Sequence, residues 1–485
     1  MNKPLRRIAI FCGVLILALL VRTNWIQYVQ ADDLSSRKEN KRVDIERYSI
    51  KRGDIIVDGK AITGSKDTDD SFFQYKRTWK NGPMWAPVTG YASQVFGTSQ
   101  IENLEDGILT GTDDRLFFSR TLDMLTGKKK GGGNVVTTLN GAAQKAAFEG
   151  LGDSKGAVAA IDPETGAILA LASTPSYDPS TFAGRSNKDG DAWNDLTNNP
   201  DKPMLNRALR ETYAPGSTFK VVTAAAALEH GLYDDVDEKT KTPEPWTMPG
   251  TRTELPNHGG NNCEKASLRE AMRVSCNTVF GKIGSDLGKE KMIETAEKFG
   301  FNEEQFVPVR SNASVFPTEL DPSQTALSSI GQFNTSATPL QMAMVTAAIA
   351  NDGTLMEPYM VSELKAPNLD TVEKHAPKTL SEPLSKPNAQ KIQQTMETVV
   401  NEGTGTNAKI DGVTVGGKTG TAETGENNEG TPFAWFISYA KTDSGSPVAV
   451  AVVIEDSNAD EAVSGGGLAA PIAKDVMKAV IDSKG

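Results

Sequence analysis

A serine and a lysine three residues apart, Ser217 and Lys220, stand where a predicted helix begins. Pro215 and Gly216 end the preceding segment, and the apolar run Val221–Leu228 continues the helical pattern. Side chains at this spacing share one helix face. A serine hydroxyl is a weak nucleophile that needs a base, and a lysine is one where burial or a nearby cation keeps it neutral. The pair is therefore a candidate nucleophile and base.

The spacing alone is not specific. The same SxxK pattern occurs at Ser35–Lys38, Ser362–Lys365 and Ser438–Lys441. A surface serine beside a solvated lysine is the ordinary explanation of such a match. The turn-to-helix context distinguishes Ser217, and so do two further motifs.

The second motif is Ser275-Cys276-Asn277, which is the one SxN sequence in the chain. It lies between two helical stretches, Leu268–Val274 and Thr278–Leu287. A short kink there would direct Ser275 and Asn277 into a cleft, as a proton relay and an amide donor. The alternative is an ordinary helix boundary, where serine and asparagine are common.

The third motif is Lys418-Thr419-Gly420, followed by Thr421, and it is the one KTG sequence in the chain. Valines precede it, so we expect Lys418 on a strand with small neighbours that let a substrate approach the backbone. The lysine supplies a positive field, the threonines supply hydroxyls, and a strand edge binds a peptide main chain. The alternative is the polar end of a hairpin with a solvated lysine.

The same segment fits a rival pattern. Residues 412–419 match the phosphate-binding loop GxxxxGK[ST], which needs a strand before Gly412 and a helix after Thr419. Here valines lie inside the supposed loop, and residues 420–430 are too rich in glycine and polar residues for a helix. We therefore treat this match as a coincidence.

The elements that must position these motifs can also be predicted. Residues 156–162 and 167–173 are apolar runs joined by turn residues, which predicts a strand–turn–strand unit. Further strands are expected at 135–139, 413–415, 434–439 and 448–454, and helices at 141–150, 221–229, 268–287, 340–350, 388–400 and 470–481. Strands at both ends with helices between them suggest one sheet assembled from distant segments.

The N-terminal part divides into three segments. Lys3, Arg6 and Arg7 precede an apolar run from Ile8, which predicts a membrane anchor over residues 8–29 with its N-terminus inside. A cleaved signal peptide is the alternative, and either reading puts residues 32–485 outside the membrane. Residues 32–54 are predicted to be a polar stalk and residues 55–130 a small mixed or β-rich module. Residues 128–133 (KKKGGG) are predicted to be a linker or exposed loop.

Composition excludes some classes of function. The net charge of −11 argues against nucleic-acid binding. Three histidines and three cysteines form no cluster with metal-ligand spacing, so we expect neither a metal nor an organic cofactor. Outside the membrane, Cys263 and Cys276 are able to pair, but two free thiols are equally compatible with the sequence.

Together, the three motifs resemble the signature of the penicillin-binding proteins and related β-lactamases, in the family order. The chain is similar to the class B penicillin-binding proteins, and most similar to the penicillin-binding protein A group. Other segments carry the likeness as well: 52–55 (RGDI), 162–170 (DPETGAILA), 206–208 (NRA), 330–332 (IGQ) and 338–343 (TPLQMA). No glycosyltransferase module fits between the anchor and Val135, which excludes the bifunctional class A type.

The resemblance implies an α+β fold with four parts. These are a cytoplasmic tail (1–7), a single transmembrane anchor (8–29), an N-terminal pedestal (30–134) and a penicillin-binding/β-lactamase-like transpeptidase domain (135–485). That domain should hold a five-stranded antiparallel sheet flanked by helices and an all-helical subdomain, with the active site between them.

The resemblance also implies roles. Ser217 is the acylated nucleophile, Lys220 its base, Ser275 a proton relay, and Asn277 the group that holds the substrate amide. Lys418 keeps Lys220 neutral and, with Thr419, Gly420 and Thr421, forms the site for the terminal carboxylate, while backbone N–H groups of Ser217 and Thr421 form the oxyanion hole.

The implied activity is cross-linking of peptidoglycan stem peptides that end in D-Ala-D-Ala, with covalent binding of β-lactams and a multi-span membrane glycan polymerase as partner. Alternatives are a D,D-carboxypeptidase, a β-lactamase, and a non-enzymatic scaffold or β-lactam sensor. The anchor and pedestal favour the transpeptidase over a β-lactamase. Retention of Ser217 and Lys220 disfavours the scaffold, and a seven-residue tail disfavours the sensor.

Overall fold

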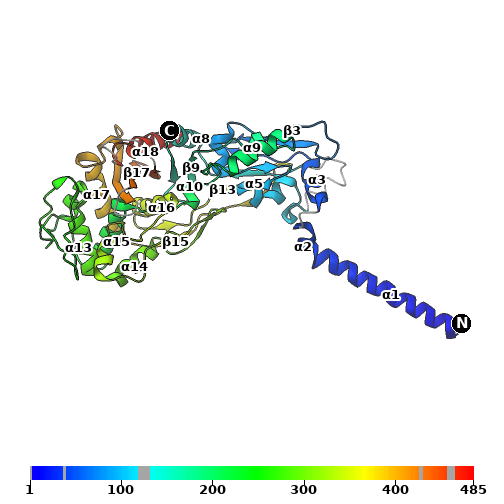
Figure 1. The fold of residues 1–485 in the computed structure, drawn as a ribbon, viewed down its shortest axis with the longest axis horizontal. Coiled ribbons are helices and arrows are strands. Elements are labelled where there is room, and N and C mark those ends of the chain that lie inside the picture. Colours follow the sequence, from blue (N-terminus) through cyan, green and yellow to red (C-terminus); the bar gives the residue numbers. More distant parts are fainter. Residues whose placement is uncertain (1–2, 37–39, 118–130, 425–429, 456–464, 485) are drawn as a thin grey trace.

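The chain is elongated in a computed structural model that describes residues 3–36, 40–117, 131–424, 430–455 and 465–484. Helix α1 (Lys3–Tyr28) projects from one end, and helices α13 (Asn277–Leu287) and α14 (Lys289–Lys298) lie at the other (Figure 1). The apolar part of α1 has a mean hydropathy of 2.2 and packs against no other part of the described chain. Its 26 residues span about 39 Å, which is enough to cross a hydrocarbon core about 30 Å thick.

The predicted stalk is partly wrong. Helices α2 (Ala31–Ser36) and α3 (Lys41–Ser49) follow the anchor. Tyr48 is buried, and its hydroxyl donates to the Ser93 carbonyl at 2.7 Å. Arg52 is buried as well. Residues 41–54 therefore belong to the folded pedestal, because one tyrosine and one arginine in a polar stretch find partners far along the chain.

The pedestal is a small mixed module, as predicted. Its elements are β1 (Ile55–Val57), β2 (Lys60–Ala61), β3 (Thr63–Asp67), β4 (Tyr75–Trp79), α4 (Gly82–Thr89), β5 (Ala92–Ser93), β6 (Gly97–Thr98), α5 (Gln100–Leu104), α6 (Asp106–Thr110) and a 3₁₀ turn at Asp114–Leu116.

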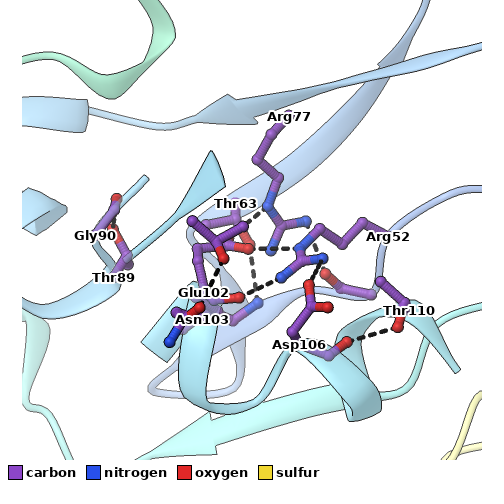
Figure 2. Close-up of polar contacts among 12 residues, drawn as sticks. Arg52, Thr63, Arg77, Thr89, Gly90, Glu102, Asn103, Asp106 and Thr110 are labelled. Atoms are coloured by element: carbon purple, nitrogen blue, oxygen red, sulfur yellow. Dashed lines mark hydrogen bonds and ion pairs between the residues drawn. The ribbon is translucent and has the colours of Figure 1, made fainter. Parts of the chain in front are cut away.

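A buried charge cluster holds these elements together (Figure 2). The fully buried Glu102 carboxylate accepts from Arg52 Nε at 2.5 Å and from Arg77 Nε at 2.6 Å. Arg52 also donates to Asp106 at 2.6 Å. Each guanidinium thus has a carboxylate partner, which is what allows such charges to stay buried.

One sheet joins the pedestal to the rest of the chain. Its order is β14-β13-β7-β1-β2, with β7 (Asn134–Thr137) parallel to β1 and antiparallel to β13 (Val361–Lys365), and β14 (Thr371–Lys374) outermost. The strand predicted at 135–139 exists, but it lies in this sheet and not beside the catalytic motifs. Of the predicted linker, Lys128–Lys130 lie outside the described residues, and Gly133 is buried with its N–H donating to the Ile108 carbonyl at 2.8 Å. Gly133 is therefore packed, and Gly131 and Gly132 are partly buried, so the glycines do not form an exposed loop.

A second five-stranded sheet is antiparallel throughout and has the order β16-β17-β18-β8-β9. Its strands are β8 (Gly156–Ile161), β9 (Ile168–Thr174), β16 (Thr414–Thr424), β17 (Gly430–Thr442) and β18 (Gly445–Ile454). Every residue of β8 and β9 is buried, which explains their continuous apolar sequences. The sheet assembled from distant segments is confirmed.

Helices cover both faces of this sheet. Helices α8 (Gly141–Leu151) and α18 (Ala469–Lys484) pack together on one face, and α16 (Pro339–Ala350) packs on the other. Helix α17 (Lys386–Glu402) lies against β16. Thr338 caps α16 by accepting from the Gln341 N–H, with Pro339 in the first turn. The predicted α+β sheet flanked by helices is present.

The helical subdomain contains α11 (Lys220–Glu229), α12 (Leu268–Val274), α13, α14 and α15 (Pro322–Ser328), and α11 and α15 both pack against α13. The stretch predicted at 268–287 is two helices, because Ser275 adopts a left-handed conformation (φ 64°) between α12 and α13. That is the predicted kink. Cys263 and Cys276, whose pairing the sequence left open, form a disulfide. The remaining α-helices and strands of the described chain are α9 (Asn187–Thr197), α10 (Arg207–Arg210), β10 (Gln305–Phe306), β11 (Arg310–Ser311), β12 (Leu355–Met356) and β15 (Thr379–Ser381).

Candidate active site

Ser217 lies on a single 3₁₀ turn, Gly216–Phe219, that leads directly into α11. The turn is held by a close backbone approach: Gly216 N–H donates to the Gly331 carbonyl at 3.0 Å. Both glycines have positive φ, and a Cβ on Gly331 would lie 2.2 Å from the Gly216 oxygen. Only glycine fits at Gly331, which gives the segment 330–332 a role in placing the serine.

Beside Ser217 is a pocket of about 440 Å³ between the sheet and the helical subdomain. Its lining residues are Ser217, Met248, Thr253, Glu254, Leu255, Pro256, Asn277, Leu327, Ile330, Gln332, Phe333 and Thr421. One residue each of the SxxK and SxN motifs, and Thr421 directly after the KTG motif, thus border one cavity. Ser217 is half-buried in its wall, so its hydroxyl is accessible to a bound molecule.

Lys220 is fully buried at the start of α11. Its Nζ lies 2.7 Å from the Ser275 carbonyl, 2.7 Å from Asn277 Oδ1 and 3.2 Å from Ser275 Oγ. No hydrogen bond joins Lys220 Nζ to Ser217 Oγ within the part of the chain that is described. A base–nucleophile contact is often long before substrate binds. Lys220, one turn beyond Ser217, is thus held in place by its contacts with the SxN motif.

Lys418 reaches the same hydroxyl from the other side. It is fully buried on β16, with Nζ 2.9 Å from Ser275 Oγ and 2.8 Å from the Thr419 carbonyl. If Lys220 is neutral, its two N–H groups donate to the Ser275 carbonyl and Asn277, and its lone pair accepts from the Ser275 hydroxyl. That hydroxyl in turn accepts from Lys418. The hydrogen bonds are consistent with one neutral amine and one ammonium.

Burial lowers the pKa of both lysines. It lowers the pKa of Lys220 well below its usual range, and the positive charge of Lys418 lowers it further. Burial alone lowers the pKa of Lys418 to about 7. A charged amine loses hydration in an apolar site, and two like charges joined through one hydroxyl oppose each other. Lys220 is therefore the first of the two to lose its proton as the pH rises.

Asn277 is held at both ends of its carboxamide. Its Oδ1 accepts from Lys220, and its Nδ2 donates to the Pro256 carbonyl at 2.8 Å. Its backbone N–H donates to Asn257 Oδ1 at 2.7 Å. The side chain borders the pocket, and its Nδ2 has a second N–H that can donate to a substrate carbonyl while the Pro256 contact is kept.

The three residues after Lys418 lie in different surroundings. Thr421 borders the pocket. Thr419 is buried, and its hydroxyl lies 2.6 Å from that of Thr404. Gly420 packs against the turn that carries the serine, since a Cβ there would lie 2.8 Å from Thr218 Cγ2 and 3.0 Å from the Pro215 oxygen. Gly420 therefore permits close approach of β16 to this turn.

Sequence reasoning missed Asn257 and Thr404. Asn257 Oδ1 accepts hydrogen bonds from the backbone N–H groups of Asn277 and Thr278, at 2.7 and 3.0 Å. Thr404 reaches Thr419 from the end of α17. Both lie in loops outside any motif, and only the glycines on either side of Thr404 marked its position as unusual.

The rival matches do not form comparable sites. Ser362 Oγ donates to the Val136 carbonyl at 3.0 Å, and Ser438 is fully buried against Met477. Lys38 lies outside the described residues. The phosphate-loop reading of 412–419 fails, because residues 414–424 form one strand where that reading needs a loop followed by a helix. Among the described residues, no group of three or more histidine, cysteine or acidic side chains is arranged to hold a metal.

Comparisons with known proteins agree with this geometry. The penicillin binding protein transpeptidase domain matches residues 156–478, and the penicillin binding protein A dimerisation domain matches residues 52–135. The peptidoglycan D,D-transpeptidase PbpA of Mycolicibacterium smegmatis is 38% identical, covering 99% of each chain.

Solved structures are similar as well. Penicillin-binding protein A from M. tuberculosis, as a ceftriaxone acyl-enzyme complex, superposes with a TM-score of 0.84 at 37% identity, covering 90% of this chain and 100% of the other. The D,D-transpeptidase domain of a peptidoglycan glycosyltransferase from Eggerthella lenta gives 0.77 at 33% identity, covering 90% and 99%. On this evidence the chain belongs to the class B penicillin-binding proteins, in the penicillin-binding protein A group.

Proposed function

We propose that this chain is a peptidoglycan D,D-transpeptidase that is acylated on Ser217. One observation carries the proposal: two buried lysines, Lys220 and Lys418, share the Ser275 hydroxyl beside a pocket bordered by Ser217. The relatives named above are peptidoglycan D,D-transpeptidases or β-lactam acyl-enzymes, which supports the same activity and covalent binding of β-lactams here.

In the first step, Ser217 Oγ attacks the carbonyl carbon between the two terminal D-alanines. Neutral Lys220 accepts the hydroxyl proton as the C–O bond forms. Backbone N–H groups of Ser217 and Thr421 donate to the developing oxyanion. The C–N bond then breaks, a proton passes from Lys220 through Ser275 to the leaving nitrogen, and free D-alanine departs from an ester on Ser217.

In the second step, an amine of a neighbouring stem peptide attacks the ester carbonyl. Its proton goes to the same base, the C–O bond breaks, Ser217 regains its hydrogen, and the new amide is the cross-link. A β-lactam enters the first step, but its opened ring stays attached to the acyl group and no amine replaces it.

Substrate placement falls to the remaining motif residues. Asn277 holds the substrate amide, and Lys418 with Thr419 and Thr421 binds the terminal carboxylate as a cation with two hydroxyls. Gly420 contributes by letting the strand approach the serine turn. The buried ammonium of Lys418 also keeps Lys220 neutral, so one residue serves both binding and proton transfer.

The anchor and pedestal suggest where this reaction takes place. We infer a tail (1–7) inside the cell, an anchor (8–29) in the cell membrane, and a pedestal (30–134) that carries the transpeptidase domain (135–485) outside. Charges before the apolar run favour this orientation. Helix α13, which begins at Asn277, lies at the end opposite α1 (Figure 1), as suits a reaction in the cell wall. A multi-span glycan polymerase that supplies the strands is the expected partner.

A thioester donor with and without a D-amino acid acceptor tests the proposal. Transpeptidation predicts that the acceptor diverts most of the acyl group into an amide product. Hydrolysis at the same rate with or without the acceptor would show a D,D-carboxypeptidase instead. If the folded protein turns over the donor neither with the D-amino acid nor with water as acceptor, a scaffold or sensor is favoured.

A further inference from the structure

An aromatic residue borders the active-site pocket from a backbone conformation that aromatic residues rarely adopt. Phe333 has a φ of 60°, which is in the left-handed region. It is the second residue of a turn in which the Thr335 N–H donates to the Gln332 carbonyl at 3.3 Å. Turns with positive φ at this position are dominated by glycine, asparagine and aspartate, because a bulky side chain strains the backbone there. The chain thus has a large ring where glycine would fit with less strain.

The ring does not contribute to a hydrophobic core. Phe333 is 43% exposed, and it belongs to none of the hydrophobic clusters formed by the described residues. Of the ten non-glycine residues with positive φ in the described chain, eight are polar or charged, and Leu369 is the one other large apolar residue. Strained residues of this kind cluster at active sites and ligand-binding sites.

The ring instead forms part of an apolar wall of the pocket beside Ser217. The apolar residues of that wall come from the loop before α12 and from the end of α15 with the residues after it: Met248, Leu255, Pro256, Leu327, Ile330 and Phe333. Met248, Leu255 and Ile330 are buried, whereas the Phe333 ring is exposed enough to contact a bound molecule.

The position of the pocket indicates which part of a donor it would receive. Asn277, which holds the substrate amide in the proposed function, borders the pocket, whereas Lys418 and Thr419, which bind the terminal carboxylate, do not. The apolar wall therefore lies on the acyl side of the bond that breaks. An apolar side chain on that part of the donor loses exposed surface against the ring, and an aromatic one adds a ring–ring contact.

We propose that Phe333 is a specificity-determining residue, whose ring binds the apolar part of the acyl group that is transferred to Ser217. The ligand is a donor peptide or a β-lactam whose acyl side chain carries an aliphatic chain or an aromatic ring. The proposal rests on the proposed function. Phe333 makes and breaks no bond, so loss of its ring should change which acyl groups are preferred, and should not change the chemistry that all of them share.

Two penicillins that differ by one group provide the test. Benzylpenicillin carries a phenylacetyl group, and 6-aminopenicillanic acid has the same fused rings and carboxylate without that group. The second-order constant of acylation is measured for each with the full-length chain in detergent micelles, from the loss of unmodified protein in intact-protein mass spectra. The variants are Phe333→Gly and Phe333→Tyr. The readout is the ratio of the two constants, because general damage to the site lowers both alike.

Leu369→Gly is the matched control. Leu369 also has a positive φ, of 73°, and is 62% exposed, but it lies between β13 and β14 and does not border the pocket. Both glycine variants should unfold at the wild-type temperature or above it, because each relieves a strained backbone conformation.

The wild type should be acylated faster by benzylpenicillin than by 6-aminopenicillanic acid. In Phe333→Gly the ratio of the two constants should fall about 5- to 50-fold, as expected for the loss of one partly buried aromatic contact. Phe333→Tyr should restore most of the ratio because it retains the ring, and Leu369→Gly should match the wild type.

A wild-type ratio in Phe333→Gly would overturn the proposal, even if both constants fall. An equal fall of the ratio in Leu369→Gly would overturn it as well. If Phe333→Gly does not fold, Phe333→Asn decides, because asparagine tolerates the left-handed conformation and has no ring. A wild-type protein that neither penicillin acylates on Ser217 would count against the proposed function instead.

Discussion

The amines of Lys220 and Lys418 meet at one oxygen: Ser275 Oγ lies 3.2 Å from Lys220 Nζ and 2.9 Å from Lys418 Nζ. The two lysines come from α11 and β16, almost 200 residues apart, and both are fully buried. Two ammonium groups this close without a carboxylate between them would repel each other strongly. The favoured state therefore has a protonated, charged Lys418 and a neutral Lys220. In that state Lys220 is able to act as a base.

Replacing the nucleophile should abolish acylation. Ser217 is the residue of the SxxK motif that borders the pocket, and Ser217→Ala removes its hydroxyl. Covalent labelling by fluorescent penicillin should therefore disappear on a denaturing gel. Ser362→Ala is the matched control, because Ser362 belongs to another SxxK match and donates to a backbone carbonyl of β7. It should label like the wild type. A Ser217→Ala protein that still labels would exclude Ser217.

Removing the base should leave the fold intact but slow the chemistry. Lys220→Met fills a similar volume without an amine, and acylation should fall about 10²- to 10⁴-fold, the usual contribution of a general base. Lys365→Met, in the control match, removes a partly exposed lysine paired with Glu363 and should change nothing. Rapid-mixing measurements with a chromogenic cephalosporin would check both. Equal rates for Lys220→Met and wild type would rule out this lysine.

Gly420 should tolerate no side chain. A Cβ there meets Thr218 Cγ2 at 2.8 Å and the Pro215 oxygen at 3.0 Å, so Gly420→Ala pushes β16 away from the serine turn. We expect about 1 to 3 kcal/mol of lost stability and about 10- to 100-fold slower acylation. Gly190→Ala is the control, since open space surrounds its position in α9. Thermal unfolding with parallel labelling measures both effects; normal acylation in Gly420→Ala would contradict the packing argument.

Glu102 should be essential to the stability of the pedestal but should not affect the rate of acylation. Glu102→Gln leaves Arg52 and Arg77 buried without the carboxylate that both contact, and the free energy of unfolding should fall by about 3 to 5 kcal/mol. Glu149→Gln, which loses an exposed pair with Lys145, should cost less than about 1 kcal/mol. Below its unfolding temperature, Glu102→Gln should acylate at the wild-type rate. A full loss of acylation in the folded variant would mean that the pedestal acts on the active site.

Much of the fold was predictable because its signals are local. The strand pair at 156–173 is marked by apolar runs and a turn, and the break at Ser275 by a serine and an asparagine between two helical stretches. Ser217, Ser275 and Lys418 could be grouped because their three motifs, in this order, resemble a family signature. Their assembly beside one pocket depends on β16 lying against the serine turn, which the small residue Gly420 next to Lys418 makes possible.

The remainder depends on contacts that no local pattern reports. Arg52 looks like any charge in a polar stretch until Glu102, fifty residues later, is placed beside it. Strand β7 has an ordinary apolar sequence, and its partners β1 and β13 could not be deduced from it. Asn257 lies in a loop that hydrogen bonds and the Cys263–Cys276 bond tie to the motif, and no local pattern reports those contacts.

The pH dependence of acylation, compared between the wild type and Lys418→Met, tests the central claim most directly. In the wild type, acylation should rise with pH as Lys220 loses its proton, and should fall again around pH 7 and above as Lys418, with its pKa lowered to about 7, loses its charge. Removing the Lys418 charge raises the pKa of Lys220, so the rising limb of the variant should move to higher pH and its falling limb near pH 7 should disappear. A rising limb at the same pH in both proteins would contradict the account, because Lys418 would then have no part in keeping Lys220 neutral.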